Sequence, residues 1–146
     1  MSRHLFETTR HIDAPADSVW GVLSDVARWP EWTPTIDSVE RLDSGPLRVG
    51  SRAEVRQPKL PRAQWEVTEL VAGRSFTWEA TGPGLRTIGR HEVDPDAGGC
   101  TVRLSIEQTG PMAGVAAMMW RGLTQRYVEL EAASLDARVT GAPPAA

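Results

Sequence analysis

The sequence is poor in cysteine, in long apolar runs and in clustered positive charge. Cys100 is the only cysteine among 146 residues, so neither an internal disulfide nor a cluster of thiolate metal ligands can form. No run of about 18 apolar residues is present, and we expect no stable membrane insertion. The net charge is −3 and the basic residues are scattered, so nucleic acid is not expected as a partner.

The sequence also lacks the common signatures of nucleotide and hydrolase chemistry. It contains no phosphate loop, no Gly-x-Gly-x-x-Gly turn and no Gly-x-Ser-x-Gly nucleophile elbow. The three histidines, His4, His11 and His91, lie far apart, so we expect neither a metal ion nor a cofactor. Because the first residues lack the apolar stretch of a signal peptide, a cytoplasmic protein is expected.

Length and composition predict a single domain. With 40% hydrophobic residues, the chain can bury one sizeable core, and it is too short for two ordinary domains. We assign residues 1–140 to this domain and residues 141–146, which include Pro143 and Pro144, to a flexible tail. A monomer or a weak homodimer is expected.

The most informative stretch covers residues 11–32. A strand ends at Ile12, and Pro15 has the fixed φ that suits a first helical position, which predicts a helix over residues 15–24. A second, short, aromatic turn follows at residues 29–32. The stretch contains three of the six tryptophans, and we expect these three to cover the mouth of a cavity: Trp20, Trp29 and Trp32.

Alternating polar and apolar residues predict seven strands and one antiparallel sheet. The expected strands cover residues 3–12, 35–42, 51–57, 63–71, 75–81, 85–93 and 100–108. In the hairpin at 63–81, four residues fall on one face and predict an aromatic wall: Trp65, Val67, Phe76 and Trp78. In the last strand Arg103, Ser105 and Glu107 are expected on a solvent-facing side.

A long helix is predicted over residues 111–139, with Pro111 at its first position. At 1.5 Å per residue, about 28 residues span roughly 42 Å, enough to cover the concave face of the sheet. The expected sheet-facing stripe steps by three or four residues: Met112, Ala116, Met119, Leu123, Tyr127, Leu130, Ser134 and Ala137.

Two linked motifs carry a resemblance to a known superfamily. The pattern apolar-x-Ala-Pro-x-x-x-Val-Trp at residues 12–20 is followed by Asp-x-x-x-Trp-Pro-x-Trp at residues 25–32. Together with landmarks at residues 49–51, 65–70, 76–79 and 99–102, this resembles the START/Bet v 1 superfamily and its bacterial polyketide cyclase/dehydrase-like branch. The resemblance covers residues 3–139. It implies an α+β helix-grip fold, in which a seven-stranded curved antiparallel sheet wraps around a long C-terminal helix, with two short helices after the first strand.

The resemblance further implies an apolar cavity between the sheet and the C-terminal helix. The cavity would bind a polyketide-like, lipid-like or aromatic small molecule. The side chains expected to contact this ligand are Phe6, Trp32, Trp65, Phe76, Trp78, Met119, Leu123 and Tyr127. Ordinary packing of small helix residues against large aromatic residues is the alternative that spacing alone leaves open.

Two polar residues are candidates for catalysis inside the cavity. Alternation places His91 on the inner face with Val93, where it would transfer a proton or would simply be a hydrogen-bonded core histidine. Arg10 shares a face with Phe6 and would either hold developing negative charge or pair with an acid such as Glu69.

These observations leave three functions open. The first is a hydrophobic-ligand-binding protein that catalyses cyclisation or dehydration of a polyketide-like chain. The second is a non-catalytic carrier of lipids or other hydrophobic molecules. The third is an interaction module like the chaperone-activating members of the superfamily, because a fold hosts many functions.

Overall fold

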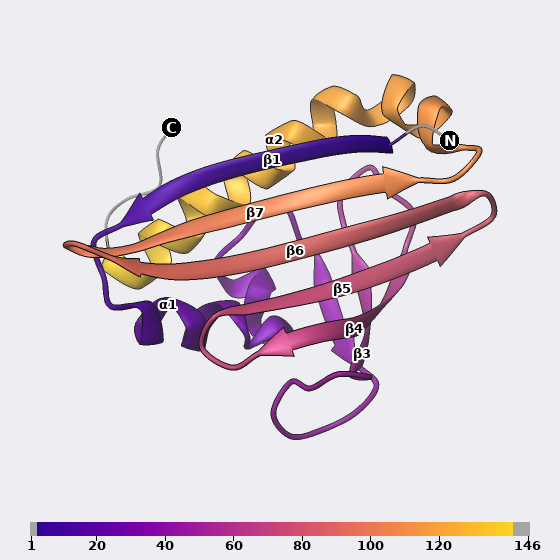
Figure 1. Cartoon of the computed structure of the whole chain (residues 1–146). Helices are drawn as coiled ribbons and strands as arrows, with labels where there is room; N and C mark the ends of the chain where they lie inside the picture. Colours follow the sequence, from indigo (N-terminus) through magenta and orange to yellow (C-terminus); the bar gives the residue numbers. More distant parts are fainter. Residues whose placement is uncertain (1–2, 142–146) are drawn as a thin grey trace.

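The computed structural model describes residues 3–141, which form one seven-stranded sheet and three helical segments (Figure 1). The strands are β1 (Arg3–Ile12), β2 (Ser38–Arg41), β3 (Arg52–Arg56), β4 (Ala63–Val71), β5 (Ser75–Gly82), β6 (Leu85–Asp96) and β7 (Gly99–Thr109). The helical segments are α1 (Ala16–Leu23), the 3-10 helix η1 (Val26–Glu31) and α2 (Ala113–Thr140). All strand pairs are antiparallel in the order β1-β7-β6-β5-β4-β3-β2. The predicted helix-grip fold is confirmed.

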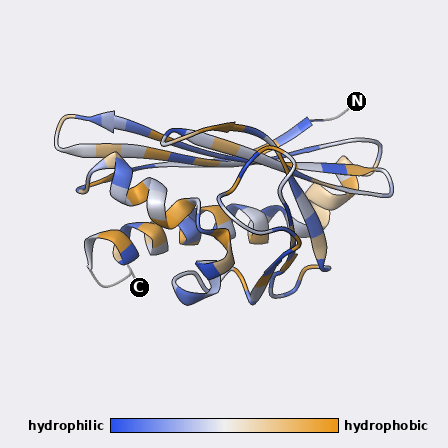
Figure 2. Cartoon of the chain, turned by 90° about the horizontal axis from the view of Figure 1, so that it is seen from below, coloured by the Kyte–Doolittle hydropathy of each residue, from blue (hydrophilic) through white to orange (hydrophobic). Residues whose placement is uncertain are grey.

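The helices all lie on one face of the sheet (Figure 2). Helix α2 packs against β1 and β7, at one side of the sheet, and α1 contacts both α2 and β6. The sequence predicts that the long helix covers the concave face. The helix does lie on that face, with its contacts concentrated on β1 and β7. Within residues 3–141, no helix is both long and apolar enough to cross a membrane. Residues 1–2 of the predicted domain and residues 142–146 of the predicted tail lie outside the described residues. Gly141, the first residue of that tail, is the C-cap of α2.

Strand β2 is shorter than predicted, because the residues before it form a hydrogen-bonded turn. The Thr33 and Thr35 hydroxyl groups are 2.8 Å apart and bonded to each other, and both side chains are buried. The Ile36 amide donates to the Thr33 carbonyl oxygen across 3.4 Å. Backbone held in this turn cannot extend to pair with β3, so the ladder begins at Ser38.

The C-terminal helix begins two residues later than predicted. The Met112 amide donates a 2.8 Å hydrogen bond to the carbonyl oxygen of Gly84, in the turn between β5 and β6. The Ala113 amide donates to the Gly110 carbonyl oxygen across 3.1 Å. The chain after β7 is thus fixed to the neighbouring turn, and helical backbone starts only after Met112. The first helix is shorter than predicted as well, with Pro15 as its N-cap rather than its first helical residue.

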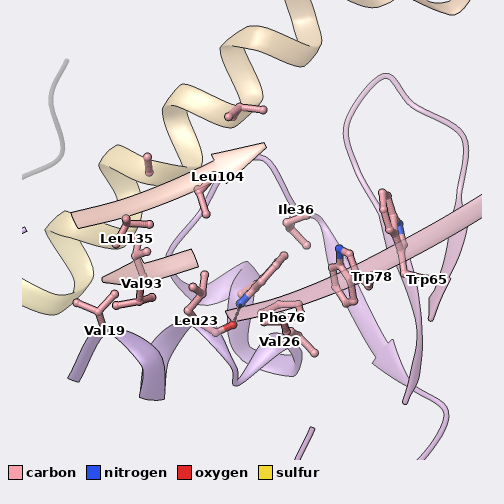
Figure 3. Packing of buried hydrophobic residues seen from close by; sticks show 14 of the residues in the cluster. Val19, Leu23, Val26, Ile36, Trp65, Phe76, Trp78, Val93, Leu104 and Leu135 are labelled. Carbon is pink, nitrogen blue, oxygen red and sulfur yellow. Dashed lines mark hydrogen bonds between the residues drawn. The ribbon is translucent and has the colours of Figure 1, made fainter. Parts of the chain in front are cut away.

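The core lies between the helices and the concave face of the sheet (Figure 3). At one end Val19 and Leu23 of α1 lie near Val93 of β6 and Leu135 of α2, and all four are fully buried. At the other end the indole rings lie against the hairpin of β4 and β5, as the alternation of that hairpin predicts. Burial of these apolar surfaces is the main favourable contribution to folding.

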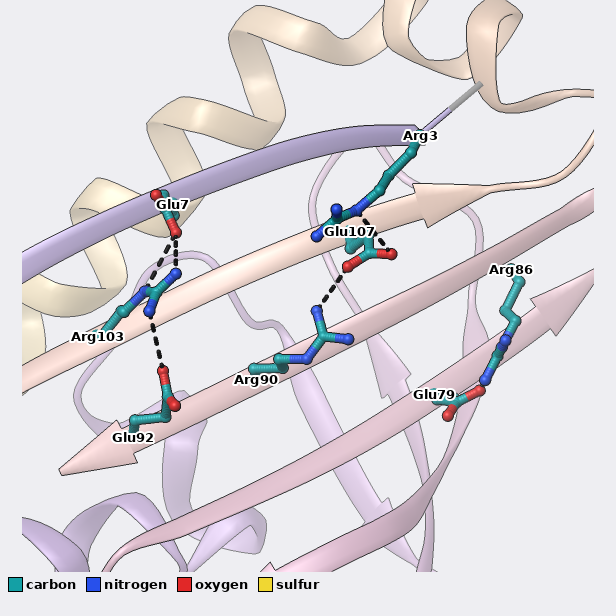
Figure 4. Close-up of polar contacts among 8 residues, drawn as sticks. All are labelled: Arg3, Glu7, Glu79, Arg86, Arg90, Glu92, Arg103 and Glu107. Atoms are coloured by element: carbon teal, nitrogen blue, oxygen red, sulfur yellow. Dashed lines mark hydrogen bonds and ion pairs between the residues drawn. The ribbon is translucent and has the colours of Figure 1, made fainter. Parts of the chain in front are cut away.

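The convex face of the sheet is covered by cross-strand ion pairs (Figure 4). Arg103 of β7 binds Glu7 of β1 at 2.8 Å, and Glu92 of β6 lies 3.8 Å away on its other side. Arg86 pairs with Glu79 across β6 and β5. Such pairs satisfy the charges of this face and contribute little stability each while they stay exposed.

One part of the convex face differs from the prediction. Ser105 and Glu107 are buried, although alternation placed them toward solvent. Arg90 and Arg3 contact the Glu107 carboxylate at 2.7 and 3.1 Å and cover it. The pKa of Glu107 is held below its ordinary value, mainly by the hydrogen bond from Arg90. Desolvation raises this pKa, and the hydrogen bond from Arg3 lowers it further.

Gly99 is a position where the fold should not tolerate a side chain. Its φ is +151°, and a Cβ there would overlap the carbonyl oxygen of Ile12. We expect Gly99→Ala to lower the free energy of unfolding by about 3 kcal/mol in urea denaturation. Gly98→Ala is the matched control, because it also has positive φ, +89°, but has no atom within 4 Å of the added Cβ. It should cost about 1 kcal/mol, and equal losses would contradict the steric explanation.

Candidate ligand-binding site

A cavity of about 480 Å³ lies between α2 and the sheet. Its sheet wall contains Trp65, Ala80, Thr87, Ile106 and Gln108, and its helix wall contains Trp120, Thr124, Tyr127, Val128 and Glu131. The loop between β3 and β4 and the turn between β5 and β6 contribute Leu60, Pro61 and Pro83. The volume falls in the range of about 300–1,000 Å³ that is typical of small-molecule sites. The interior is therefore not packed solid.

A smaller annex of about 50 Å³ adjoins this cavity. The two share part of their walls, which comprises Gln57, Trp65, Ile106, Val128 and Glu131. The other annex walls include Trp29, Ile36, Val55, Trp78, His91 and Leu104. The annex is too small for a drug-sized molecule, but it adjoins the place where one end of a ligand in the large cavity would lie.

The aromatic wall depends on a glycine in the neighbouring strand. Trp78 of β5 stands opposite Gly89 of β6, and a Cβ at Gly89 would lie 3.0 Å from the Trp78 Nε1 atom. The missing side chain lets the indole lie against the sheet, where its centroid is 5.4 Å from that of Trp65. The shared face of Trp65 and Trp78, which the sequence predicts, is confirmed, and both rings line the annex.

Trp29 lies inside the protein rather than at a cavity mouth. It is 2% exposed, and its Nε1 donates a 3.0 Å hydrogen bond to the Leu23 carbonyl oxygen. Its ring contacts Trp32, Phe76, Trp78 and His91 at centroid distances of 5.2–6.3 Å. The expected tryptophan gate is wrong in this respect, because Trp29 is a core residue.

His91 lies in the aromatic cluster and lines the annex. Its ring stacks on Phe76 with a centroid distance of 4.1 Å, and its Nδ1 lies 3.1 Å from the Phe76 carbonyl oxygen. A carbonyl can only accept, so Nδ1 carries the proton and Nε2 is left as an acceptor. Burial lowers the pKa of His91 to about 4, against a smaller opposing effect of that hydrogen bond. At neutral pH the ring is uncharged.

Arg10 does not line either cavity. Its Nε donates to the Asp136 carboxylate of α2 at 2.7 Å, which attaches the helix to β1. The sequence left open a pairing with an acid and suggested Glu69, but the partner comes from the C-terminal helix. Arg10 is on the inner face of β1, as alternation predicts, yet Asp136 occupies its guanidinium group.

The predicted sheet-facing stripe of α2 is confirmed in part, because Ala116 and Ser134 are buried. Met119 is 65% exposed and Met112 is 45% exposed, so neither faces the sheet. The buried helix residues are Ala113, Ala116, Ala117, Val128, Ala132, Ser134 and Leu135. Tyr127 of the predicted stripe lines the cavity, and Trp120 and Thr124, which lie outside that stripe, line it as well. Trp120 and Thr124 were missed by the sequence analysis.

The predicted ligand contacts are therefore only partly brought together. Trp65, Trp78 and Tyr127 line the cavity or its annex. Phe6 and Phe76 are buried core residues outside the walls of the cavity and the annex. Trp32, Met119 and Leu123 do not line either space. The Tyr127 hydroxyl donates to the Pro58 carbonyl oxygen at 2.5 Å and so ties the loop between β3 and β4 to the helix.

Glu131 is the functional candidate that the sequence analysis missed. It lies one helical turn after Tyr127 and lines both the large cavity and the annex. Its carboxyl group has no hydrogen-bond or ion-pair partner within residues 3–141. Burial raises the pKa of Glu131 to about 7, and no neighbouring charge contributes to the change. The spacing of Trp120, Thr124, Tyr127 and Glu131 by three or four residues was the available signal.

The comparisons identify the family and the fold. The family model described as polyketide cyclase/dehydrase and lipid transport matches residues 3–140. Norcoclaurine synthase from Thalictrum flavum, in complex with dopamine and hydroxybenzaldehyde, is similar with a TM-score of 0.75 and 15% identity, over 97% of this chain and 89% of that one. The protein TTHA0849 from Thermus thermophilus has a TM-score of 0.75 and 19% identity, over 95% and 99% of the two chains.

A di-domain protein from the BE-7585A biosynthetic pathway has the same fold. The di-domain ARO/CYC protein BexL has a TM-score of 0.71 and 17% identity, over 99% of this chain and 51% of its own. No curated protein sequence matches the chain. At these identities the structural likeness shows the fold, and the family model carries the assignment to a family.

The raised pKa of Glu131 predicts a measurable dependence of stability on pH. The folded protein favours the protonated carboxyl, so this contribution is present below about 4.5, the ordinary pKa, and is lost as the pH rises through about 7. His91 acts oppositely, since its contribution is present above 6.5 and is lost as the pH falls toward about 4. The two therefore compensate in part in wild-type protein between these values.

Glu131→Gln should remove one side of this balance. We expect the variant to gain stability over wild type as the pH rises from 4.5 to 8, by roughly 2 kcal/mol, because a pKa difference of one corresponds to about 1.4 kcal/mol. Urea denaturation at several pH values measures this difference. The exposed Glu129→Gln on the same helix is the control and should stay within about 0.5 kcal/mol of wild type. A pH-independent effect of Glu131→Gln would contradict the raised pKa.

Proposed function

The chain belongs to the polyketide cyclase/dehydrase and lipid transport family, and from this premise we propose that it binds one hydrophobic small molecule in the large cavity. The observation that carries the proposal is an open volume of about 480 Å³ beside Trp65, Trp120 and Ile106. Apolar walls with a few polar groups are characteristic of ligand sites.

The cavity walls suggest how such a molecule would be oriented. Its rings or chain would lie against Trp65 and Trp120, while amide and hydroxyl groups of Gln108, Thr87 and Thr124 are available for hydrogen bonds. In the similar norcoclaurine synthase structure the bound molecules are dopamine and hydroxybenzaldehyde, two small aromatic compounds. This supports an aromatic or polyketide-like ligand here, with a lipid chain as the alternative.

Filling the cavity should abolish binding without unfolding the protein. We expect Thr124→Phe to lower the affinity for the neutral fluorescent probe N-phenyl-1-naphthylamine by about tenfold or more, because its ring would occupy the space of the ligand. A titration of the probe fluorescence measures this. Met118→Phe adds the same ring to the same helix at a position that is 81% exposed, and it should bind like wild type. Equal affinities of all three proteins would place the probe elsewhere.

An enzymatic role is a second proposal, and Glu131 is the observation that favours it. A carboxyl group with a pKa of about 7 is present in both protonation states at neutral pH, which suits a general acid or base. In the dehydration of a β-hydroxy ketone, the Glu131 carboxylate would take the proton next to the carbonyl. The protonated Glu131 would then give this proton to the departing hydroxyl group, which leaves as water while the carbon–carbon double bond forms. His91, with its pKa of about 4, is better suited to accept a hydrogen bond through Nε2.

The two candidate bases can be separated by kinetics. With a β-hydroxy ketone that the protein dehydrates, Glu131→Gln should lower kcat about 100-fold or more, while N-phenyl-1-naphthylamine still binds. His91→Gln and Arg10→Gln should each lower kcat much less, because His91 is a weak base and Arg10 is bound to Asp136. Absorbance of the conjugated enone product gives the rate. A larger loss in His91→Gln would return the catalytic role to the histidine.

A further inference from the structure

The charged groups that line the cavity are unequally partnered. Among the described residues, Glu131 is the one acid in the cavity and annex walls. These walls also include Arg62 and Arg90, but the Arg90 guanidinium group lies on the convex face of the sheet (Figure 4). Arg62 contacts Glu54 at 3.3 Å, and Arg90 contacts Glu107 at 2.7 Å. Both guanidinium groups are therefore engaged by other carboxylates. Glu131 is left in the interior without a cation.

The neighbouring polar atoms do not supply the missing positive charge. His91 lines the annex and donates through Nδ1 to the Phe76 carbonyl oxygen, so its Nε2 is unprotonated. The Tyr127 proton is used in the bond to the Pro58 carbonyl oxygen. The annex walls thus combine the Glu131 carboxyl group with an uncharged imidazole and with the indole rings of Trp65 and Trp78.

A carboxylate with indole rings is the combination that binds an alkylammonium or arylammonium group. The carboxylate accepts charge-assisted hydrogen bonds from the ammonium, and aromatic faces attract the cation. A ligand that brings a carboxylate would instead place a second negative charge beside Glu131 in a poorly solvated interior. A neutral ligand would gain the burial of its apolar surface and ordinary hydrogen bonds, but no attraction between opposite charges.

We propose that the cavity selects hydrophobic amines, with the ligand ammonium paired to Glu131 and the apolar part of the ligand against Trp65 and Trp120. The inference rests on the proposed function, because it names the class of ligand that the same cavity takes. It goes beyond that function because it assigns a positive charge to the ligand and names Glu131 as the residue that binds this charge.

The selectivity should depend on pH through Glu131 alone. The other titratable groups in the walls do not change charge between pH 5.5 and 8.5: His91 stays neutral, with its pKa at about 4, and the pKa of Tyr127 is raised, mainly by burial. An alkylammonium group also stays charged, since its pKa is near the value of about 10.4 for lysine. Binding of the amine should therefore strengthen as Glu131 ionises.

Three probes of equal chain length test the proposal: octylamine, 1-octanol and octanoate. Binding is followed by tryptophan fluorescence and confirmed by calorimetry at pH 5.5 and 8.5. At pH 8.5 we expect octylamine to bind about tenfold more tightly than 1-octanol, and octanoate about tenfold more weakly. At pH 5.5, where Glu131 is mostly protonated, the advantage of octylamine should shrink to about threefold or less.

Variants separate the contribution of Glu131 from the net charge of the protein. Glu131→Gln should bind octylamine and 1-octanol with similar affinity at both pH values. Glu129→Gln removes one exposed acid from the same helix and should keep the wild-type preference. If Glu131→Gln does not fold, the pH dependence of the wild-type preference still decides the matter, because it requires no substitution.

The outcomes distinguish the two proposals. If 1-octanol binds in the cavity but octylamine shows no preference at pH 8.5, the amine inference is overturned and the hydrophobic site stands. A preference that persists in Glu131→Gln overturns the role of this residue. If none of the three probes binds, the proposed function itself fails.

Discussion

The shape of the interior depends on where Trp29 packs. This indole lies between η1 and the strands β5 and β6, and it contacts both Trp78 and His91. Its Nε1 is bonded to the Leu23 carbonyl oxygen, which fixes the ring relative to α1. A large ring held in this place fills the end of the concave face near α1. Helix α2 packs on β1 and β7 at the other side, so neither element closes the space over β4, β5 and β6.

Buried acidic groups are paired on the convex face of the sheet but not in the cavity on its other side. On the convex face each acid that approaches burial is met by arginine, as Glu107 is met by Arg90 and Arg3. In the cavity on the concave side of the sheet, Glu131 of α2 is left without such a partner, and burial alone raises its pKa to about 7. An unpaired carboxyl group costs stability, and such costs are concentrated at sites that act on ligands. This contrast between the convex face and the cavity marks Glu131 as a candidate ligand-binding residue.

Much of the fold could be predicted from the sequence, because the alternation of apolar residues and the positions of turn residues agree with the observed strands and turns. The hairpin of β4 and β5 alternates over most of its length, with one register shift between Val67 and Glu69, and Gly73 between its strands has the positive φ that a tight turn requires. The face of α2 could not be predicted in the same way. Its apolar residues are spread around the helix, and Met118 and Met119 are exposed, so spacing alone does not select the buried stripe.

The candidate site was harder to predict than the fold, for a related reason. A glutamate on a helix ordinarily faces water, and a sequence does not distinguish a cavity-facing position from a solvent-facing one. Only the placement of α2 along β1 and β7 turns Glu131 inward, together with Tyr127. Arg10 shows the converse. It lies on the inner face of β1, but its guanidinium group binds Asp136 of α2 and not a ligand site. Long-range packing decides which polar residue meets a ligand and which meets another side chain.

Proton binding and ligand binding at Glu131 are linked by thermodynamics. A group near half-ionisation at neutral pH changes its proton occupancy whenever a ligand changes its surroundings. A ligand cation would favour the ionised form and release a proton, whereas a purely apolar ligand that excludes water would favour the protonated form and take one up. The sign of the proton exchange therefore reports the charge that the ligand brings to the cavity. The same carboxyl group that lowers stability at high pH thus makes the interior responsive to the chemistry of its ligand.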